Sequence, residues 1–211
     1  MRNFKKTLSF LLSTVIIVSS VVGVGTTVFA ATDEHTYKNF KYRILDDNTA
    51  EICGYTGKNA VVTVPDSIDS KPVTSIGRTA FYSGKIKEVT IPNTVRSIKW
   101  WAFYGCESLE KINLNFGLKT VGYGAFMNCK NLKSVSIPMS VTQICDDSFA
   151  VSCSTKKGVF DTYSKQTIST QQYSTDSSFT LEGYSGTVAE KYCNDNSLNF
   201  VSSGNVIYGD V

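Results

Sequence analysis

The sequence predicts an α+β repeat solenoid of about four coils, each 22–23 residues long, with a capping segment at either end. Two observations predict it. The chain repeats itself at an offset of 23 residues, and each repeat contains one short stretch in which apolar and polar residues alternate. A coil of this kind can bury its apolar side only against its neighbours, so the core must form by stacking.

The repeat is carried by apolar positions that hold over consecutive coils. The aligned sets are Ile86, Leu109 and Leu132; Val89, Ile112 and Val135; Ile91, Leu114 and Ile137; Val95, Leu118 and Val141; Ile98, Val121 and Ile144; Ala102, Ala125 and Ser148; and Phe103, Phe126 and Phe149. An offset of 22 extends the pattern upstream to Ile76, Ala80 and Phe81. A partial repeat therefore comes first, and we expect its strand at residues 61–64.

Each coil is expected to supply one short strand. Val89, Thr90 and Ile91 alternate apolar, polar, apolar, which is typical of a strand with one buried face. Pro92 and Pro138 follow such strands and end them, because proline has no N–H to donate to the next strand. The chain turns there and returns to the core.

The repeat pattern resembles the BspA-like class of bacterial leucine-rich repeats. It reads L-x-x-I-x-I-P-x-x-V-x-x-I-x-x-x-A-F-x-x-C, occurs in residues 86–106 and 109–129, and covers roughly residues 60–153. The resemblance implies a leucine-rich-repeat solenoid in a secreted or surface-associated bacterial protein that takes part in adhesion or protein–protein contact. The departures are modest: Asn115 replaces a proline, Trp100 and Trp101 interrupt the usual turn, and Cys145 replaces a glycine.

The first 30 residues are expected to be a signal peptide. Basic residues near Met1 precede a long uncharged stretch, and Val28-Phe29-Ala30 places small residues where a signal peptidase reads, so we expect cleavage after Ala30. The alternative is an uncleaved membrane anchor. Cleavage removes three of the 21 basic residues, which leaves 18 against 18 acidic ones. A neutral mature chain has no electrostatic attraction for nucleic acid or for an anionic membrane, so neither is an expected partner.

The flanks are expected to cap the solenoid and cover its open ends. Residues 31–59 predict an N-terminal hairpin, with one strand at 40–44 and its return at 50–53. Residues 179–203 predict a C-terminal cap made of a helix, which begins at the capping box Thr187-Val188-Ala189-Glu190, and a last strand at Phe200-Val201. Between the array and this cap, residues 154–178 predict a Ser/Thr-rich loop or insertion, and residues 204–211 a tail or linker.

The six cysteines of an exported chain raise the question of disulfides. Cys106 and Cys129 occupy one position in successive coils, where parallel side chains would strain a disulfide, so we expect buried thiols. Cys145 and Cys153 lie in one coil and are the candidate disulfide, whereas Cys53 and Cys193 are expected in opposite caps.

The sequence does not predict an enzyme. Its one histidine, His35, falls in a polar segment near the expected mature N-terminus, where we expect disorder, so no Ser-His-Asp or Cys-His arrangement can form in the folded part. The sequence has no C-x-x-C pair for zinc and no glycine-rich phosphate loop, and we expect neither a metal nor a cofactor.

The expected binding surface is the outward face of the strands. Its side chains form two rows, namely Glu88, Lys111 and Ser134, and Thr90, Asn113 and Ser136. A second candidate is the group Trp100, Trp101 and Tyr123, because tryptophan and tyrosine are frequent in binding hot spots and stack on sugar rings. These aromatic side chains could equally pack beneath a loop.

Two functions remain open. The first is a non-enzymatic module that binds a protein at the cell surface or in the matrix. The second is a carbohydrate-binding or accessory module of a polysaccharide-degrading assembly, which Trp100 and Trp101 suggest. The final residues Gly209-Asp210-Val211 also resemble the start of a dockerin, although an ordinary frayed C-terminus would look the same.

Overall fold

The computed structural model describes residues 34–150, 152–161, 166–174 and 178–205, with the backbone alone between 152 and 174. The chain divides into residues 1–31 and 32–211, and the first of these units lies outside the described residues. The predicted signal peptide and the predicted tail motif at 209–211 also lie outside them.

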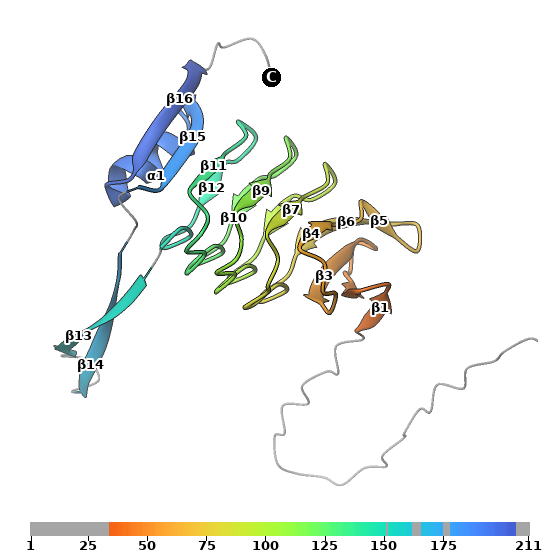
Figure 1. Ribbon diagram of the computed structural model, residues 1–211, viewed down its shortest axis with the longest axis horizontal. Helices are drawn as coiled ribbons and strands as arrows, with labels where there is room; N and C mark the ends of the chain where they lie inside the picture. Colours follow the sequence, from red (N-terminus) through yellow and green to blue (C-terminus); the bar gives the residue numbers. More distant parts are fainter. Residues whose placement is uncertain (1–33, 151, 162–165, 175–177, 206–211) are drawn as a thin grey trace, which may run out of the picture. The chain divides into compact units, whose positions relative to one another are not determined.

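The repeat produces a parallel ladder of short strands, one per coil (Figure 1). Val89 of β7 lies between Val62 of β4 and Ile112 of β9, each buried, so the alternating residues do have one face in the core. The strands are β4 (Val61–Thr63), β7 (Glu88–Thr90), β9 (Lys111–Asn113) and β11 (Ser134–Ser136). The solenoid and its repeat are therefore confirmed.

The other side of each coil carries a second parallel ladder, in which one longer strand is followed by strands of two residues that recur every 23 positions. Its members are β6 (Lys71–Ile76), β8 (Ser97–Ile98), β10 (Thr120–Val121) and β12 (Gln143–Ile144). The short strand β5 (Ser67–Ile68) folds back antiparallel on β6 within the longer turn of the first coil. Ile76, Ile98 and Val121 are fully buried, so this ladder closes the core.

The predicted N-terminal hairpin is confirmed. β2 (Phe40–Ile44) and β3 (Ala50–Tyr55) pair antiparallel, and β3 continues the second ladder by pairing with β6 in parallel. The expectation of disorder at His35 is wrong, because β1 (His35–Tyr37) adds a third strand to the hairpin. The imidazole of His35 packs against the ring of Tyr42 at 5.3 Å between centroids, and this contact explains the order.

Stacked phenylalanines run through the core, one from each coil. Their centroids are 4.8 Å apart for Phe81 and Phe103, and 5.2 Å for each of the next two pairs, formed by Phe103, Phe126 and Phe149. Tyr55 of the N-terminal cap covers the first ring at 5.6 Å. Because every ring lies on its neighbour, each coil is held by the coils on both sides.

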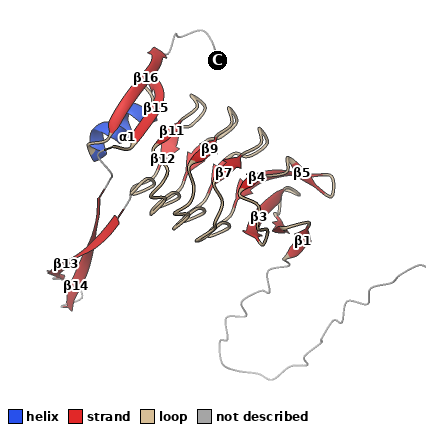
Figure 2. Ribbon diagram, viewed as in Figure 1, coloured by secondary structure: helices blue, strands red, loops and turns tan. Residues whose placement is uncertain are grey.

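The C-terminal cap extends the first ladder by two strands. β15 (Thr180–Ser185) pairs in parallel with β11, and β16 (Asn199–Asn205) pairs in parallel with β15. Between them lies α1 (Val188–Asn196), the helix that the capping box predicts and the one helix in the described residues (Figure 2). The hydrogen bonds at the start of the helix differ from those of a capping box. Glu190 accepts a hydrogen bond from the N–H of Gly186 at 2.7 Å, and Thr187 Oγ1 donates to the carbonyl of Tyr184.

The Ser/Thr-rich segment is an insertion with regular structure. β13 (Ser152–Asp161) and β14 (Gln166–Ser174) pair antiparallel, with a register shift between Lys156 and Val159. The composition, which lacks core-forming residues, predicted a loop or an insertion without secondary structure. The backbone hydrogen bonds between two antiparallel strands do not depend on apolar side chains, so the composition did not exclude a hairpin.

Candidate binding surface

The two predicted rows of side chains lie side by side on the first ladder. Glu88 pairs with Lys111 in register, and Thr90 pairs with Asn113. The rows continue in both directions beyond the predicted residues, to β4 on one side and to β15 on the other, where Ser134 faces Thr180 and Ser136 faces Glu182. We call this surface the strand face.

The middle of the strand face is cross-linked by its own side chains. Lys111 Nζ lies 3.0 Å from Glu88 Oε1, and Asn113 Nδ2 donates to the same oxygen at 3.0 Å and to Thr90 Oγ1 at 3.2 Å. These hydrogen bonds, the one from Lys111 foremost, lower the pKa of Glu88 below its ordinary value. The outward residues of β7 and β9 therefore form a fixed polar platform.

A loop at the edge of the strand face presents an exposed aromatic ring. The buried Asn115 replaces proline after β9, and its Oδ1 accepts a hydrogen bond from the N–H of Gly117 at 2.6 Å. This turn leaves the intervening residue, Phe116, 80% exposed. The equivalent positions in the neighbouring coils are Asn93 and Met139, so the ring is specific to this coil.

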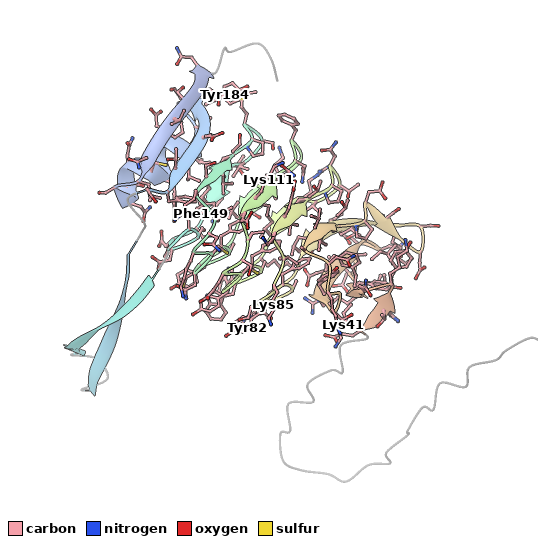
Figure 3. All side chains as sticks on the ribbon, in the orientation of Figure 1. Lys41, Tyr82, Lys85, Lys111, Phe149 and Tyr184 are labelled. Carbon is pink, nitrogen blue, oxygen red and sulfur yellow. The ribbon has the colours of Figure 1, made fainter. Side chains whose placement is uncertain are left out.

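Phe116 lies at a groove of about 250 Å³ between β9, β11 and β15. Apolar walls come from the side chains of Leu114, Ile137, Pro138 and Tyr184, and the polar residues Asn113 and Ser136 line the same groove. Figure 3 labels Lys111 on β9 and Tyr184 on β15, the two strands at its sides. The groove thus combines an apolar anchoring surface with polar groups of the second predicted row, Asn113 and Ser136.

Sequence reasoning placed Asn113 and Ser136 on this surface but missed Phe116 and Tyr184. Phe116 could have been found, because it follows the asparagine that replaces proline and has no aromatic equivalent in the adjacent coils. Tyr184 could not, since it reaches the groove only when β15 pairs with β11 across the insertion.

The tryptophans lie in a turn outside this groove. Trp101 lies between the guanidinium of Arg78, 4.7 Å from its ring centre, and the ring of Tyr123 at 6.2 Å. Its φ is +56°, a left-handed conformation in which its counterpart in the next coil is Gly124. Trp100 is 57% exposed. The predicted group is therefore divided, with Trp101 and Tyr123 packed together and Trp100 open to solvent.

The structure describes the thiols of three of the four cysteines in the repeat array, namely Cys106, Cys129 and Cys145. Cys106 and Cys129 are buried and free, and donate to the carbonyls of Phe81 and Phe103 in the preceding coils at 2.9 and 3.2 Å. Cys145 is half-buried, while the side chain of Cys153, its predicted partner, lies outside those that the structure describes. The pairing of Cys145 with Cys153 thus stays a prediction.

The described residues contain no group of three or more histidine, cysteine, aspartate or glutamate side chains that could hold a metal ion. Among these same residues, no helix has the length and apolar character needed to cross a membrane.

The family comparison agrees with the ladder. The BspA type leucine rich repeat region matches residues 62–180 in six copies. This range runs from β4 into the start of β15, past the predicted array at 60–153. Among curated proteins, none matches the chain.

Several solved structures are similar. A leucine-rich repeat protein from Bacteroides capillosus is 31% identical with a TM-score of 0.52, over 54% of this chain and 88% of that one. One from T. pallidum is 30% identical with a TM-score of 0.47, over 55% and 66%. A leucine rich cell surface protein from Faecalibacterium prausnitzii is 26% identical with a TM-score of 0.49, and the match covers 73% of this chain but 46% of that longer one.

Proposed function

We propose that this chain, which belongs to the BspA-type leucine-rich repeat family, is a non-enzymatic module that binds a protein partner through its strand face. We further propose that it works outside the cell, secreted or at the surface, in adhesion. The predicted signal peptide supports the second proposal, as does the wording "cell surface protein" given to a similar protein from Faecalibacterium prausnitzii.

One observation carries the proposal: an aromatic ring that is 80% exposed lies at a partly apolar groove beside the hydrogen-bonded polar side chains of the strand face. Protein interfaces concentrate their binding energy in a few aromatic anchors that are surrounded by polar contacts. Phe116 has the exposure of such an anchor, and Tyr184 borders the same groove. The polar platform of Glu88, Lys111 and Asn113 would supply the surrounding contacts.

The alternative function, a carbohydrate-binding or accessory module, was predicted from the two tryptophans. The ring of Trp101 contacts Arg78 and Tyr123, so Trp100 is the ring of the pair that is exposed for stacking on a sugar. Trp100 lines neither the groove at Phe116 nor the two cavities near Tyr82 and Tyr104, so it is weaker support than the groove at Phe116. We therefore favour the protein partner.

The test is quantitative binding of the mature chain to a panel of purified extracellular and matrix proteins, measured by biolayer interferometry. A partner held at the groove should lose roughly 30-fold in affinity on Phe116→Ala, the size expected for an aromatic hot spot. Tyr184→Ala should weaken the same complex.

Trp100→Ala is the matched control, because it removes another exposed aromatic ring from a different surface. It should leave the affinity unchanged. A partner that is lost with Trp100→Ala and retained with Phe116→Ala would overturn the assignment to the strand face. Circular dichroism spectra would show that each variant is folded.

A further inference from the structure

Two tyrosines from successive coils stack on the turn side of the solenoid. The ring planes of Tyr82 and Tyr104 are 6° apart with centroids at 5.4 Å. Tyr82 is 57% exposed, and among the described side chains Tyr104 is the one ring that stacks on it. Tyr55 of the N-terminal cap instead contacts Phe81 in the inner row, with its ring tilted by 32° at 5.6 Å between centroids. The outer stack therefore ends at Tyr82 with one ring face uncovered.

A cavity of about 350 Å³ lies between the N-terminal cap and the first complete turn, and Tyr82 is part of its lining. Tyr55 and Tyr82 line it together with Lys41, Lys58 and Lys85. Figure 3 shows Tyr82 and Lys85 close together in one turn. A volume of this size holds a small ligand of one or two rings.

The charge of the cavity is positive. Glu34 is the one acidic residue of its lining, and it forms a long ion pair with Lys41 at 3.9 Å. Lys58 and Lys85 are exposed, and no ion pair holds either of them within the described part of the chain. Two ammonium groups that lack an ion-pair partner among the described residues thus belong to the same cavity lining as Tyr82.

A second compartment of about 360 Å³ continues along the coils and shares Gly84 and Lys85 with the first. Tyr104, Ser108 and Asn128 line it with hydroxyl and amide groups, and Asn128 Nδ2 donates to the Tyr104 hydroxyl at 3.1 Å. Glu107 also lies there, with its charge met by Lys130 at 2.5 Å. The groove therefore continues from a cationic compartment into one suited to hydroxyl groups.

We propose that this groove binds an acidic saccharide of uronic-acid units. One pyranose ring stacks on the uncovered face of Tyr82, its carboxylate lies between Lys58 and Lys85, and the next unit meets Tyr104 and Asn128. Sugar rings present C–H faces to aromatic rings and hydroxyl groups to amides, and a uronate adds the negative charge that the free lysines lack. The inference concerns a surface distinct from the strand face and does not rest on the proposed protein partner.

The test is isothermal titration calorimetry of the mature chain with a galacturonic acid trisaccharide at low salt. Tyr82→Ala should lower the affinity roughly tenfold, and Tyr82→Phe should retain it because the ring face is kept. Lys58→Gln and Lys85→Gln should each lower it about threefold, and added salt should weaken the wild-type complex.

Four controls make the result decisive. Lys119→Gln removes an exposed lysine outside both compartments and should leave the affinity unchanged. If the methyl-esterified trisaccharide bound as tightly as the acid form, the role of the carboxylate would be overturned. If benzoate bound as tightly, the assignment of the ligand as a saccharide would be overturned. Absence of binding by a folded chain would overturn the proposal, while Phe116→Ala should leave saccharide binding intact.

Discussion

At the scale of single residues, Gly124 occupies a left-handed backbone position at which the neighbouring coils have residues with a side chain. Its φ is +57°, and Trp101 and Asp147, at the same position of the adjacent coils, have φ of +56° and +52°. A Cβ on Gly124 would lie 2.7 Å from Cδ1 of Trp101. We therefore expect Gly124→Ala to lower the free energy of unfolding by roughly 2 kcal/mol, from backbone strain and this clash together.

Chemical denaturation measures the effect, and Gly186→Ala provides the control. Gly186 has φ of +82° with nothing within 4 Å of the added Cβ, so its substitution should cost about 1 kcal/mol from the backbone alone. Trp101→Ala in the Gly124→Ala background should recover part of the loss. Equal costs at the two glycines would contradict the clash.

Glu51 is the one charged residue that is buried among those described, at 1% exposure. Its carboxylate accepts hydrogen bonds from Ser75 at 2.6 Å and Arg43 at 2.5 Å, and it pairs with Lys99. Burial by itself would raise the pKa, but the hydrogen bonds and charges of Lys99, Ser75 and Arg43 outweigh it and hold the pKa below the ordinary 4.5. The ionised form is therefore stabilised by the fold.

This shift predicts a dependence of stability on pH. Because the folded pKa is depressed, the contribution of Glu51 is present above about pH 4.5 and is lost as the pH falls through the lower folded value. Glu51→Gln should cost roughly 2 kcal/mol at pH 7 and flatten the loss of stability below pH 4.5. Melting curves recorded from pH 3 to 7 measure this dependence. Glu110→Gln removes an exposed carboxylate and should leave the pH profile of stability unchanged. An unaltered pH profile in Glu51→Gln would contradict the role of Glu51.

At the scale of elements, the sequence predicted what the repeat enforces and missed what depends on distant pairing. The strands of the first ladder and the helix α1 follow from local periodicity. The repeat also aligns Ser148 with Ala102 and Ala125. Ser148 is buried at this position, and its hydroxyl donates to the carbonyls of Gly122 and Cys145. The two-residue strands of the second ladder are too short to show a period. The groove at Phe116 depends on β15, which joins β11 across the insertion.

The helix α1 is too short to be stable alone, so its packing must hold it. Tyr192, buried in α1, lies edge-on to Phe149 at 5.9 Å, and its hydroxyl accepts a long hydrogen bond from the Phe149 N–H at 3.4 Å. Burial raises the pKa of Tyr192, so the hydroxyl stays neutral. Tyr192→Ala should cost about 3 kcal/mol and release α1 first.

Hydrogen exchange resolves this order. Amides of α1 and β16 should lose protection in Tyr192→Ala while those of β7 and β9 keep it. Lys191→Ala removes an exposed ion pair with Asp195 on the same helix and should change neither. Uniform loss of protection along the chain would mean that the cap and the coils unfold as one unit.

At the scale of the whole described fold, the insertion at 152–174 separates two neighbouring rungs of one ladder. Phe149 before it and Phe179 after it stack at 5.4 Å, and Val135 of β11 pairs in register with Leu181 of β15. The ends of the insertion therefore meet at the distance of adjacent coils. This arrangement explains why the family repeats continue to residue 180, although the sequence predicted an array that stops at 153.

The same geometry predicts that the hairpin β13–β14 can be removed without loss of the fold. Replacing residues 152–174 by a Gly-Ser linker of about four residues leaves both sides of the ladder intact, and the entropy of loop closure changes only slightly with loop length. The midpoint of thermal unfolding should shift by less than about 3 °C. The matched control, Phe149→Ala in the full chain, removes the contact with Phe179 and should lower stability by roughly 3 kcal/mol. If the shortened chain lost cooperative unfolding while Phe149→Ala kept it, the hairpin and not the phenylalanine stack would be what joins the C-terminal cap to the coils.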